Sequence, residues 1–147
     1  MRILSARNLS RGIELGDRIL EARTHWTRLR GMLGRPEPGV GEGLLLLPCQ
    51  AVHMFGMRYP LDVAFLADDG IVVAIYDRLQ PSQVSKRHPE ATTALELRAG
   101  TLGSSGTRVG DRIELSSANV EQTVDSSPVE ARVAGMSVEE PEYWITR

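Results

Sequence analysis

Two apolar segments joined by a tight turn constrain the fold of this 147-residue chain more than any other feature. Residues 61–67 and 71–77 are apolar at nearly every position, and Asp68-Asp69-Gly70 lies between them. An Asp-Gly pair between two apolar runs is typical of a β-hairpin. Strands that face water on one side alternate apolar and polar residues, so continuous apolar strands indicate that both faces are covered, as between two packed sheets. We therefore expect a mostly β protein.

The rest of the chain predicts further short strands and one helix. The predicted strands lie at residues 3–6, 18–22, 44–47 and 92–98, with a last one ending at residue 115. Thr24 is a suitable N-cap for a helix over residues 24–33, which Gly34 would end. Residues 100–110 form a small-residue connector with room for one helical turn. Short strands separated by turn signals predict a single-domain β-sandwich, a jelly-roll-like fold or a partly open barrel, with one short helix near residues 24–33.

Length and composition limit the classes of protein to which the chain belongs. A chain of this length fits one domain, for which we expect residues 1–116, and residues 117–147 form a C-terminal extension with an added edge strand around residues 129–133. The net charge of −2 gives no general attraction to nucleic acid or to an anionic membrane. A single cysteine excludes an internal disulfide, and no apolar window reaches the length of a membrane span. We expect a soluble, cytoplasmic protein.

The charges are distributed unevenly along the chain. Residues 1–35 hold eight arginines and three acids, whereas residues 117–147 hold six acids and two arginines. The simplest interpretation is that the two ends attract each other or face water. A sharper alternative is that the basic segment 24–35 binds a protein partner.

Four polar residues interrupt the apolar segment 48–66, and they are the first candidates for a site. These residues are Cys49, His53, Arg58 and Asp62. Polar groups buried without partners cost about 1–3 kcal/mol each, so we expect them to pair with one another. Arg58 and Asp62 either form an ion pair that aligns two strands, or bind an anionic or hydroxylated ligand.

The surroundings of Asp62 leave two structural questions open. A two-residue turn in the hairpin would place Asp62 opposite Asp77, where like charges repel, and a shift of one residue would avoid this. The peptide bond between Tyr59 and Pro60 is a candidate for the cis isomer. Glu96, between two leucines of a predicted strand, is a fifth candidate because it faces away from the side that these leucines bury.

A nucleophilic or metal site is less favoured than a binding site. In an extended strand, Cys49 and His53 would be about 13 Å apart, too far for a catalytic pair unless the chain turns between them. No CxxC, HxH or HExxH spacing is present. We therefore predict no metal and no cofactor.

Four motifs, in order and at approximate spacing, resemble a bacterial and archaeal family known as domain-of-unknown-function family 192 (DUF192). The motifs are Gly31-Met32-Leu33-Gly34-Arg35, the segment 48–66, Leu95-Glu96-Leu97-Arg98-Ala99-Gly100 and Val109-Gly110-Asp111-Arg112. The resemblance covers roughly residues 15–115 and implies a compact β-sandwich or jelly-roll-like barrel with a short helix, but no activity. Its elements match Pro60-Leu61-Asp62 and Leu95-Glu96-Leu97, while Met54 stands where the branch with the Cys–His pair usually has threonine.

Three functions are compatible with these observations. The first, which we favour, is a non-catalytic module that binds a small polar or anionic ligand in a pocket near His53, Arg58 and Asp62, with Glu96 and Cys49 beside it. The second is a hydrolase-like enzyme that uses His53 and Asp62, with or without Cys49. The third is a structural or interaction protein in which the polar cluster is purely architectural.

Overall fold

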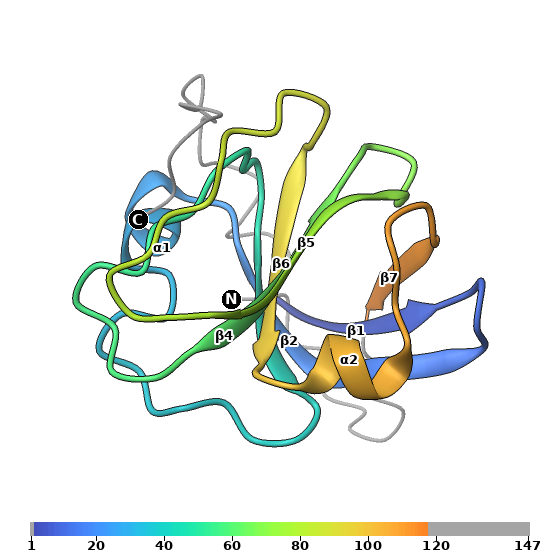
Figure 1. Cartoon of the computed structure of the whole chain (residues 1–147), viewed down its shortest axis with the longest axis horizontal. Helices are drawn as coiled ribbons and strands as arrows, with labels where there is room; N and C mark the ends of the chain where they lie inside the picture. The colour runs from blue at the N-terminus through green and yellow to red at the C-terminus, as the bar shows by residue number, and fades with distance from the viewer. Residues whose placement is uncertain (1, 118–147) are drawn as a thin grey trace, which may run out of the picture.

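The computed structural model describes residues 2–117, apart from the side chains of His25, Trp26 and Leu29. This part of the chain forms seven strands and two short helices (Figure 1). In chain order they are β1 (Ile3–Asn8), β2 (Ile13–Ala22), α1 (His25–Arg30), β3 (Glu42–Leu46), β4 (Leu61–Leu66), β5 (Val72–Leu79), β6 (Thr93–Arg98), α2 (Thr101–Ser105) and β7 (Ile113–Ser117). The predicted C-terminal extension and its edge strand lie outside the described residues.

The strands form one mixed sheet that curls into a half-barrel. Their order is β5-β4-β6-β3-β2-β1-β7, and β2 and β3 are parallel while the other neighbours are antiparallel. The outer strands approach each other at a seam, where Ile71 bridges to Arg112 and the Val72 amide donates a hydrogen bond to the Asp111 carbonyl at 2.8 Å. Of the expected architectures, the partly open barrel is confirmed. Neither helix of the described residues is long or apolar enough to cross a membrane.

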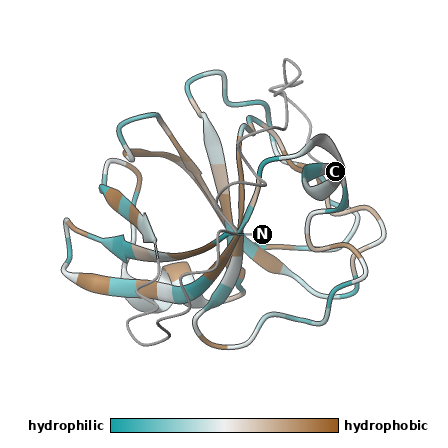
Figure 2. Cartoon of the chain, turned by 180° about the vertical axis from the view of Figure 1, so that it is seen from behind, coloured by the Kyte–Doolittle hydropathy of each residue, from teal (hydrophilic) through white to brown (hydrophobic). Residues whose placement is uncertain are grey.

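Both faces of the sheet carry an apolar core. The concave core takes residues from all seven strands and from α2. Its main members are Leu4, Leu15, Ile19, Leu45, Leu66, Leu95, Leu97, Leu102 and Ile113. The convex core packs beneath loops and the turn after α1. Its main members are Met32, Leu44, Leu46, Val52, Met54, Met57, Leu61, Val63 and Phe65. In Figure 2 the central strands are largely brown, whereas the strands on the β1, β2 and β7 side alternate brown and teal.

These two cores explain why the hairpin strands are so apolar. Every residue of β4 is buried, as predicted, because β4 lies between β5 and β6 and is covered on both faces. The covering layer is made of loops rather than of a second sheet. The prediction that both faces are covered is wrong for β5, which is mostly half-buried because it is an outer strand of the sheet.

The predicted helix is present but ends earlier than expected. The Thr24 hydroxyl accepts a hydrogen bond from the Thr27 amide at 3.1 Å, so the predicted N-cap is confirmed. The helix ends at Arg30 rather than residue 33 because Gly31 adopts a φ of 51° that favours glycine. A helical turn is also present in the 100–110 connector, as α2.

Candidate functional site

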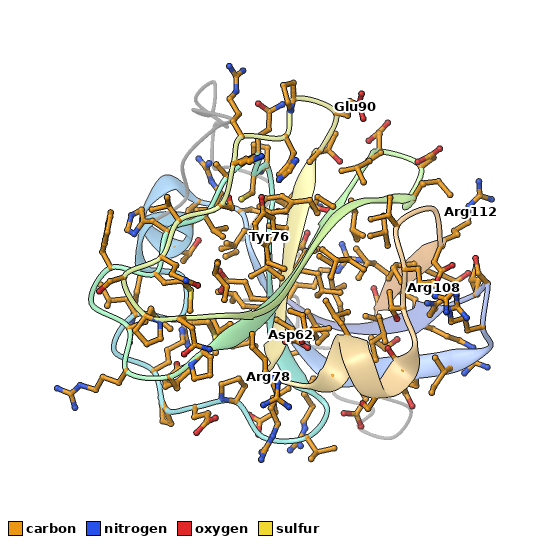
Figure 3. The ribbon with its side chains drawn as sticks, viewed as in Figure 1. Asp62, Tyr76, Arg78, Glu90, Arg108 and Arg112 are labelled. Carbon is orange, nitrogen blue, oxygen red and sulfur yellow. The ribbon has the colours of Figure 1, made fainter. Side chains whose placement is uncertain are left out.

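Asp62 lies at the start of β4, on the concave face, and is completely buried. Its Oδ1 accepts a hydrogen bond from the Arg78 amide at 2.9 Å, and its Oδ2 accepts one from the Leu102 amide at 2.8 Å. Figure 3 shows Asp62 next to Arg78, at the end of the sheet where α2 lies. Leu102 belongs to the first turn of α2, whose N-cap is a glycine without a side-chain cap, so the Asp62 carboxylate takes over the role of an N-cap.

The register of the hairpin answers the question raised by Asp77. Leu61 pairs with Leu79 and Val63 with Tyr76, so β5 carries one extra residue opposite Asp62. Arg78 has a φ of 53°, which turns its amide toward the Asp62 carboxylate. Asp77 is exposed, so the two carboxylates are not buried together. Among the described residues the cis peptide bond is Leu47–Pro48, and Tyr59–Pro60 is trans.

The environment of Asp62 acts on its ionisation in two directions. Burial raises the pKa of the Asp62 carboxyl above its ordinary value, while hydrogen bonds from the backbone of Leu102, Arg78 and Gly100 oppose the rise. The nearby charge of Asp77 raises this pKa further. Because both oxygens of Asp62 are occupied by backbone amides, the geometry is that of a structural anchor.

Glu96 and Cys49 lie on the other side of the sheet from Asp62. Glu96 pairs with Val63 of β4 and Leu44 of β3, so its side chain shares the convex face with theirs, and it is completely buried. Cys49 belongs to the convex core, and its thiol donates a hydrogen bond to the Ala51 carbonyl at 3.3 Å. Asp62 and Glu96 therefore do not share a pocket.

His53 and Arg58 belong to the loops that cover the convex core. The backbone of His53 bridges to Val84, and its Nδ1 accepts a hydrogen bond from the Phe55 amide at 3.4 Å. Arg58 is exposed. Within residues 2–117, no ion pair joins Arg58 to Asp62.

The five predicted residues are thus divided between the two faces of the sheet and the loop surface. Asp62 lies in the barrel, Glu96 and Cys49 lie in the convex core, and His53 and Arg58 lie in the covering loops. In the described part of the chain, no group of three or more His, Cys, Asp or Glu side chains is placed to hold a metal ion. A ligand site at His53 and Arg58 stays a prediction, but it would not include Asp62.

A hollow of about 350 Å³ lies at the end of the barrel opposite α2, and we call it the barrel mouth. Its wall is apolar and belongs to the concave core. The wall residues are Leu4, Leu45, Leu66, Ile113 and Leu115. Its rim is polar and charged. The rim residues are Arg2, Glu21, Arg23, Asp68, Asp69 and Thr93. Mouths of β-barrels are common sites for small ligands, because an apolar interior meets polar groups there.

Glu21 is the buried charge of the barrel mouth. It lies opposite Leu45, and its side chain is 3% exposed. Its Oε1 pairs with Arg23 Nε, and its Oε2 lies 3.9 Å from Arg2 Nε. This Oε2 is buried and has no hydrogen-bond partner in the described part of the protein. Since the two arginine side chains are 59% and 60% exposed, they cover the carboxylate from the solvent side.

A second hollow, of about 360 Å³, lies beside α2. Its charged lining residues are Glu14 and Arg98, both exposed. The other polar lining side chains are the hydroxyls of Thr101, Ser104 and Ser105. No buried charged side chain lines this hollow, so it offers a ligand less specific chemistry than the barrel mouth does.

None of the charged residues of the barrel mouth was predicted from the sequence. A signal was nevertheless present at Glu21, which stands between Leu20 and Ala22 in an apolar strand. The same pattern singled out Glu96 between two leucines. The arginines carried no comparable signal, because Arg2 and Arg23 resemble the other arginines of a basic segment.

Comparisons with known proteins support the fold and leave the chemistry open. The model of the DUF192 family, described as "Uncharacterized ACR", matches residues 10–115. The fold is similar to that of a protein of unknown function from Novosphingobium aromaticivorans DSM 12444, with a TM-score of 0.66, 24% identity, and coverage of 76% of this chain and 83% of that one. It is also similar to a putative transcription regulator from Sinorhizobium meliloti 1021, with a TM-score of 0.64, 26% identity, and coverage of 77% and 92%. No curated protein matches the chain.

Proposed function

We propose that this chain, which belongs to the DUF192 family, is a non-catalytic module that binds a small polar or anionic ligand at the barrel mouth. The class of ligand is the one that the sequence predicts, whereas the site is different from the predicted pocket near His53, Arg58 and Asp62. Asp62 is not offered to a ligand, because it is completely buried and each of its oxygens already accepts a hydrogen bond from a backbone amide.

The single observation that carries the proposal is the buried Oε2 of Glu21, which has no hydrogen-bond partner within residues 2–117. A buried acceptor without a donor costs about 1–3 kcal/mol, so this atom favours any molecule that brings a donor into the hollow. The exposed guanidinium groups of Arg2 and Arg23 add donors at the rim. A ligand at the barrel mouth would therefore form hydrogen bonds with groups whose hydrogen-bonding capacity the described residues do not fully use.

The geometry favours binding over hydrolysis. A hydrolase that used His53 and Asp62 would need both side chains within reach of one substrate. Asp62 faces the barrel interior beneath α2, whereas His53 lies in the loops over the opposite face of the sheet. Cys49 is completely buried in the convex core, where a substrate has no direct access.

A thermal-shift screen of the whole chain against a panel of small polar and anionic metabolites tests the proposal. We expect a stabilising compound to raise the melting temperature of the wild type and to have little effect on Glu21→Gln, which keeps the size of the side chain. His53→Ala and Arg58→Ala are the matched controls and should respond as the wild type does. Loss of the response in these two variants, with Glu21→Gln unaffected, would move the site back to the covering loops.

Protein binding is a second candidate function, favoured by an apolar patch in the covering loops. Leu33, Phe55 and Val84 are exposed there. Leu33 packs closely against the turn at Gly56, because a Cβ atom at that glycine would lie 2.9 Å from the Leu33 side chain. Phe55 also stacks on His53, with ring centroids 4.9 Å apart. Arg30 lies beside the patch, because its Nε donates to the Leu33 carbonyl at 3.4 Å. Apolar anchors next to basic side chains suit an acidic protein segment, in agreement with the partner predicted for residues 24–35.

Sedimentation of the protein with an acidic, leucine-containing peptide tests this second function. We expect binding to weaken in Phe55→Ser and to weaken further at high salt, because salt screens the charges. Val109→Ser, which changes an exposed apolar residue outside the patch, is the control. Equal binding by both variants would remove the patch as a docking surface.

A further inference from the structure

The charges around the barrel mouth are separated into a basic and an acidic side. Arg2 and Arg23 lie where β1 begins and β2 ends, and both contact Glu21. Asp68 and Asp69 lie in the turn between β4 and β5, and β3 and β6 stand between this turn and β2 in the sheet. A ligand that enters the mouth therefore meets Arg2, Arg23 and the Glu21 carboxylate on one side, and Asp68 and Asp69 on the other.

The guanidinium groups at the rim retain donors for an anion. Arg23 uses its Nε for Glu21, and Arg2 donates from one terminal nitrogen to the Ser117 hydroxyl at 2.6 Å. The remaining N–H groups of two arginines suit a carboxylate, which accepts such hydrogen bonds in pairs. The basic side of the mouth thus selects a ligand with a carboxylate.

The acidic side chains of the barrel mouth favour a ligand that also carries a positively charged group. The Oε2 of Glu21, which accepts no hydrogen bond from the described residues, is an available acceptor, and the exposed residue Asp68 lines the hollow on the other side. Asp69 is partly engaged, since its Oδ1 accepts a hydrogen bond from the Ile71 amide at 3.1 Å. An ammonium group, which has three donors and no acceptor, matches this set of acceptors better than a hydroxyl does.

The wall below the rim is suited to an aliphatic group. Leu45, Leu66 and Ile113 are nearly completely buried around the hollow, so a short aliphatic side chain would extend the concave core. The volume of about 350 Å³ is near the lower end of ligand pockets, which span roughly 300–1,000 Å³. A small ligand is therefore favoured over a nucleotide or a peptide.

We propose that the barrel mouth binds a small zwitterion of the aliphatic α-amino acid type, with its carboxylate at Arg2 and Arg23 and its ammonium group at Glu21. This inference rests on the proposed function, because it names the ligand class of the same site. The aliphatic side chain of the ligand points into the barrel, against the leucine wall. No bond is made or broken.

Isothermal titration of the whole chain with L-leucine tests the inference, with two analogues that each lack one charge. These analogues are 4-methylpentanoate, which lacks the ammonium group, and isopentylamine, which lacks the carboxylate. We expect L-leucine to bind at least about tenfold more tightly than either analogue, since each charge contributes a charge-assisted hydrogen bond. Glycine should also bind more weakly, because it has no side chain to contact the apolar wall of the barrel mouth.

Variants show which side of the mouth binds which charge. Glu21→Gln should reduce the preference for L-leucine over 4-methylpentanoate, and Arg23→Gln the preference for L-leucine over isopentylamine. Arg58→Ala should bind L-leucine as the wild type does. The affinities of two ligands are compared within one variant. A general loss of stability would weaken both affinities and would leave their ratio unchanged.

Two outcomes would overturn the inference, and they are distinguishable. If 4-methylpentanoate binds as tightly as L-leucine and Glu21→Gln weakens both equally, the zwitterion is wrong while the barrel mouth remains a ligand site. If none of the four compounds binds, and every metabolite that stabilises the wild type stabilises Glu21→Gln equally, then both the ligand class and the proposed function are wrong.

Discussion

At the α2 end of the barrel, Asp62 accepts hydrogen bonds from two backbone amides, whereas at the barrel mouth the Glu21 carboxylate pairs with two arginine side chains. Both carboxylates lie on the concave face and both are buried. The difference lies in the partners. The backbone amides of β5 and α2 are held by the fold, whereas the side chains of Arg2 and Arg23 are more than half exposed and can be reached by a ligand.

This comparison separates a carboxylate that serves the fold from one that is suited to binding. Removing the Asp62 carboxylate leaves two amide donors unsatisfied, while removing the Glu21 charge leaves two arginines that water solvates. Burial alone therefore does not identify a functional acid. The informative features are whether its partners are backbone amides or exposed side chains, and whether a hollow lies beside it.

The largest expected effect is at the α2 end. Asp62→Ala removes the acceptor of the Leu102 and Arg78 amides, and each unsatisfied buried amide costs about 1–3 kcal/mol. We expect the free energy of unfolding, measured by urea denaturation, to fall by about 4 kcal/mol. Asp77→Ala, which changes the exposed neighbour in β5, is the control and should change it by less than about 1 kcal/mol. Similar losses in the two variants would show that Asp62 is not the anchor of α2.

The seam between the outer strands should be the next most sensitive place. Gly70 has a φ of 85°, and a Cβ atom there would lie 2.5 Å from the Ile113 carbonyl oxygen. Gly70→Ala combines backbone strain with a clash across the seam, so we expect a loss of about 3 kcal/mol. Gly12→Ala is the matched control, because Gly12 has a φ of 64° but nothing within 4 Å of its Cβ position.

Backbone strain alone should cost about 1–2 kcal/mol in Gly12→Ala. The difference between the two glycine variants therefore measures closure of the seam. Equal losses would mean that the added methyl group costs nothing at the seam, and that the two outer strands are less firmly linked than the contacts of Ile71 and Val72 indicate.

A third carboxylate, Asp111, lies at the same seam and has the opposite pKa shift to Asp62. The Asn8 side chain, the Arg108 amide and Arg11 donate hydrogen bonds to it and lower its pKa to about 2. Because the pKa of Asp111 in the folded protein is below its usual value of 3.8, its ionised form stabilises the fold above pH 4. This stability is lost as the pH falls from 4 to 2.

We expect Asp111→Asn to reduce the free energy of unfolding by about 2 kcal/mol at pH 6 and by much less at pH 2, measured by urea denaturation at each pH. Glu114→Gln, an exposed acid in the adjacent strand β7, is the control and should show a smaller dependence on pH. A loss in Asp111→Asn that is the same at both pH values would attribute the effect to hydrogen bonding rather than to charge.

The strands whose bounds were predicted well are those with continuous apolar residues, because such residues indicate a strand that is buried on both faces. The predicted bounds of β4 and β6 are within one residue of the observed ones, because both are buried on both faces. The predicted second strand began at residue 18, whereas β2 begins at Ile13. Residues 13–17 pair with β1 at the rim of the sheet, and such pairing needs backbone hydrogen bonds but no apolar pattern.

The site was harder to predict because its partners are distant or belong to the backbone. The apolar neighbours of Asp62 correctly indicated burial, but its partners are amides 16 and 40 residues away, and amides have no sequence signature. The sequence suggests Arg58 as a partner because it lies four residues before Asp62. The sequence does not reveal the hollow at Glu21, because only the curled sheet brings residues 21, 68 and 113 together.

The smallest expected effect on stability is at the barrel mouth, where Glu21→Gln removes a charge that contacts two exposed arginines. Ion pairs with solvent-exposed arginines contribute about 0–1 kcal/mol, and a neutral amide is less costly to bury than a carboxylate, so the two effects nearly cancel. We expect urea denaturation to detect a change of less than about 1 kcal/mol. The variant should nevertheless bind L-leucine more weakly than the wild type does, whereas Asp62→Ala should mainly reduce stability. A loss of several kcal/mol in Glu21→Gln would instead make Glu21 a second structural anchor, and the contrast between the two ends of the barrel would disappear.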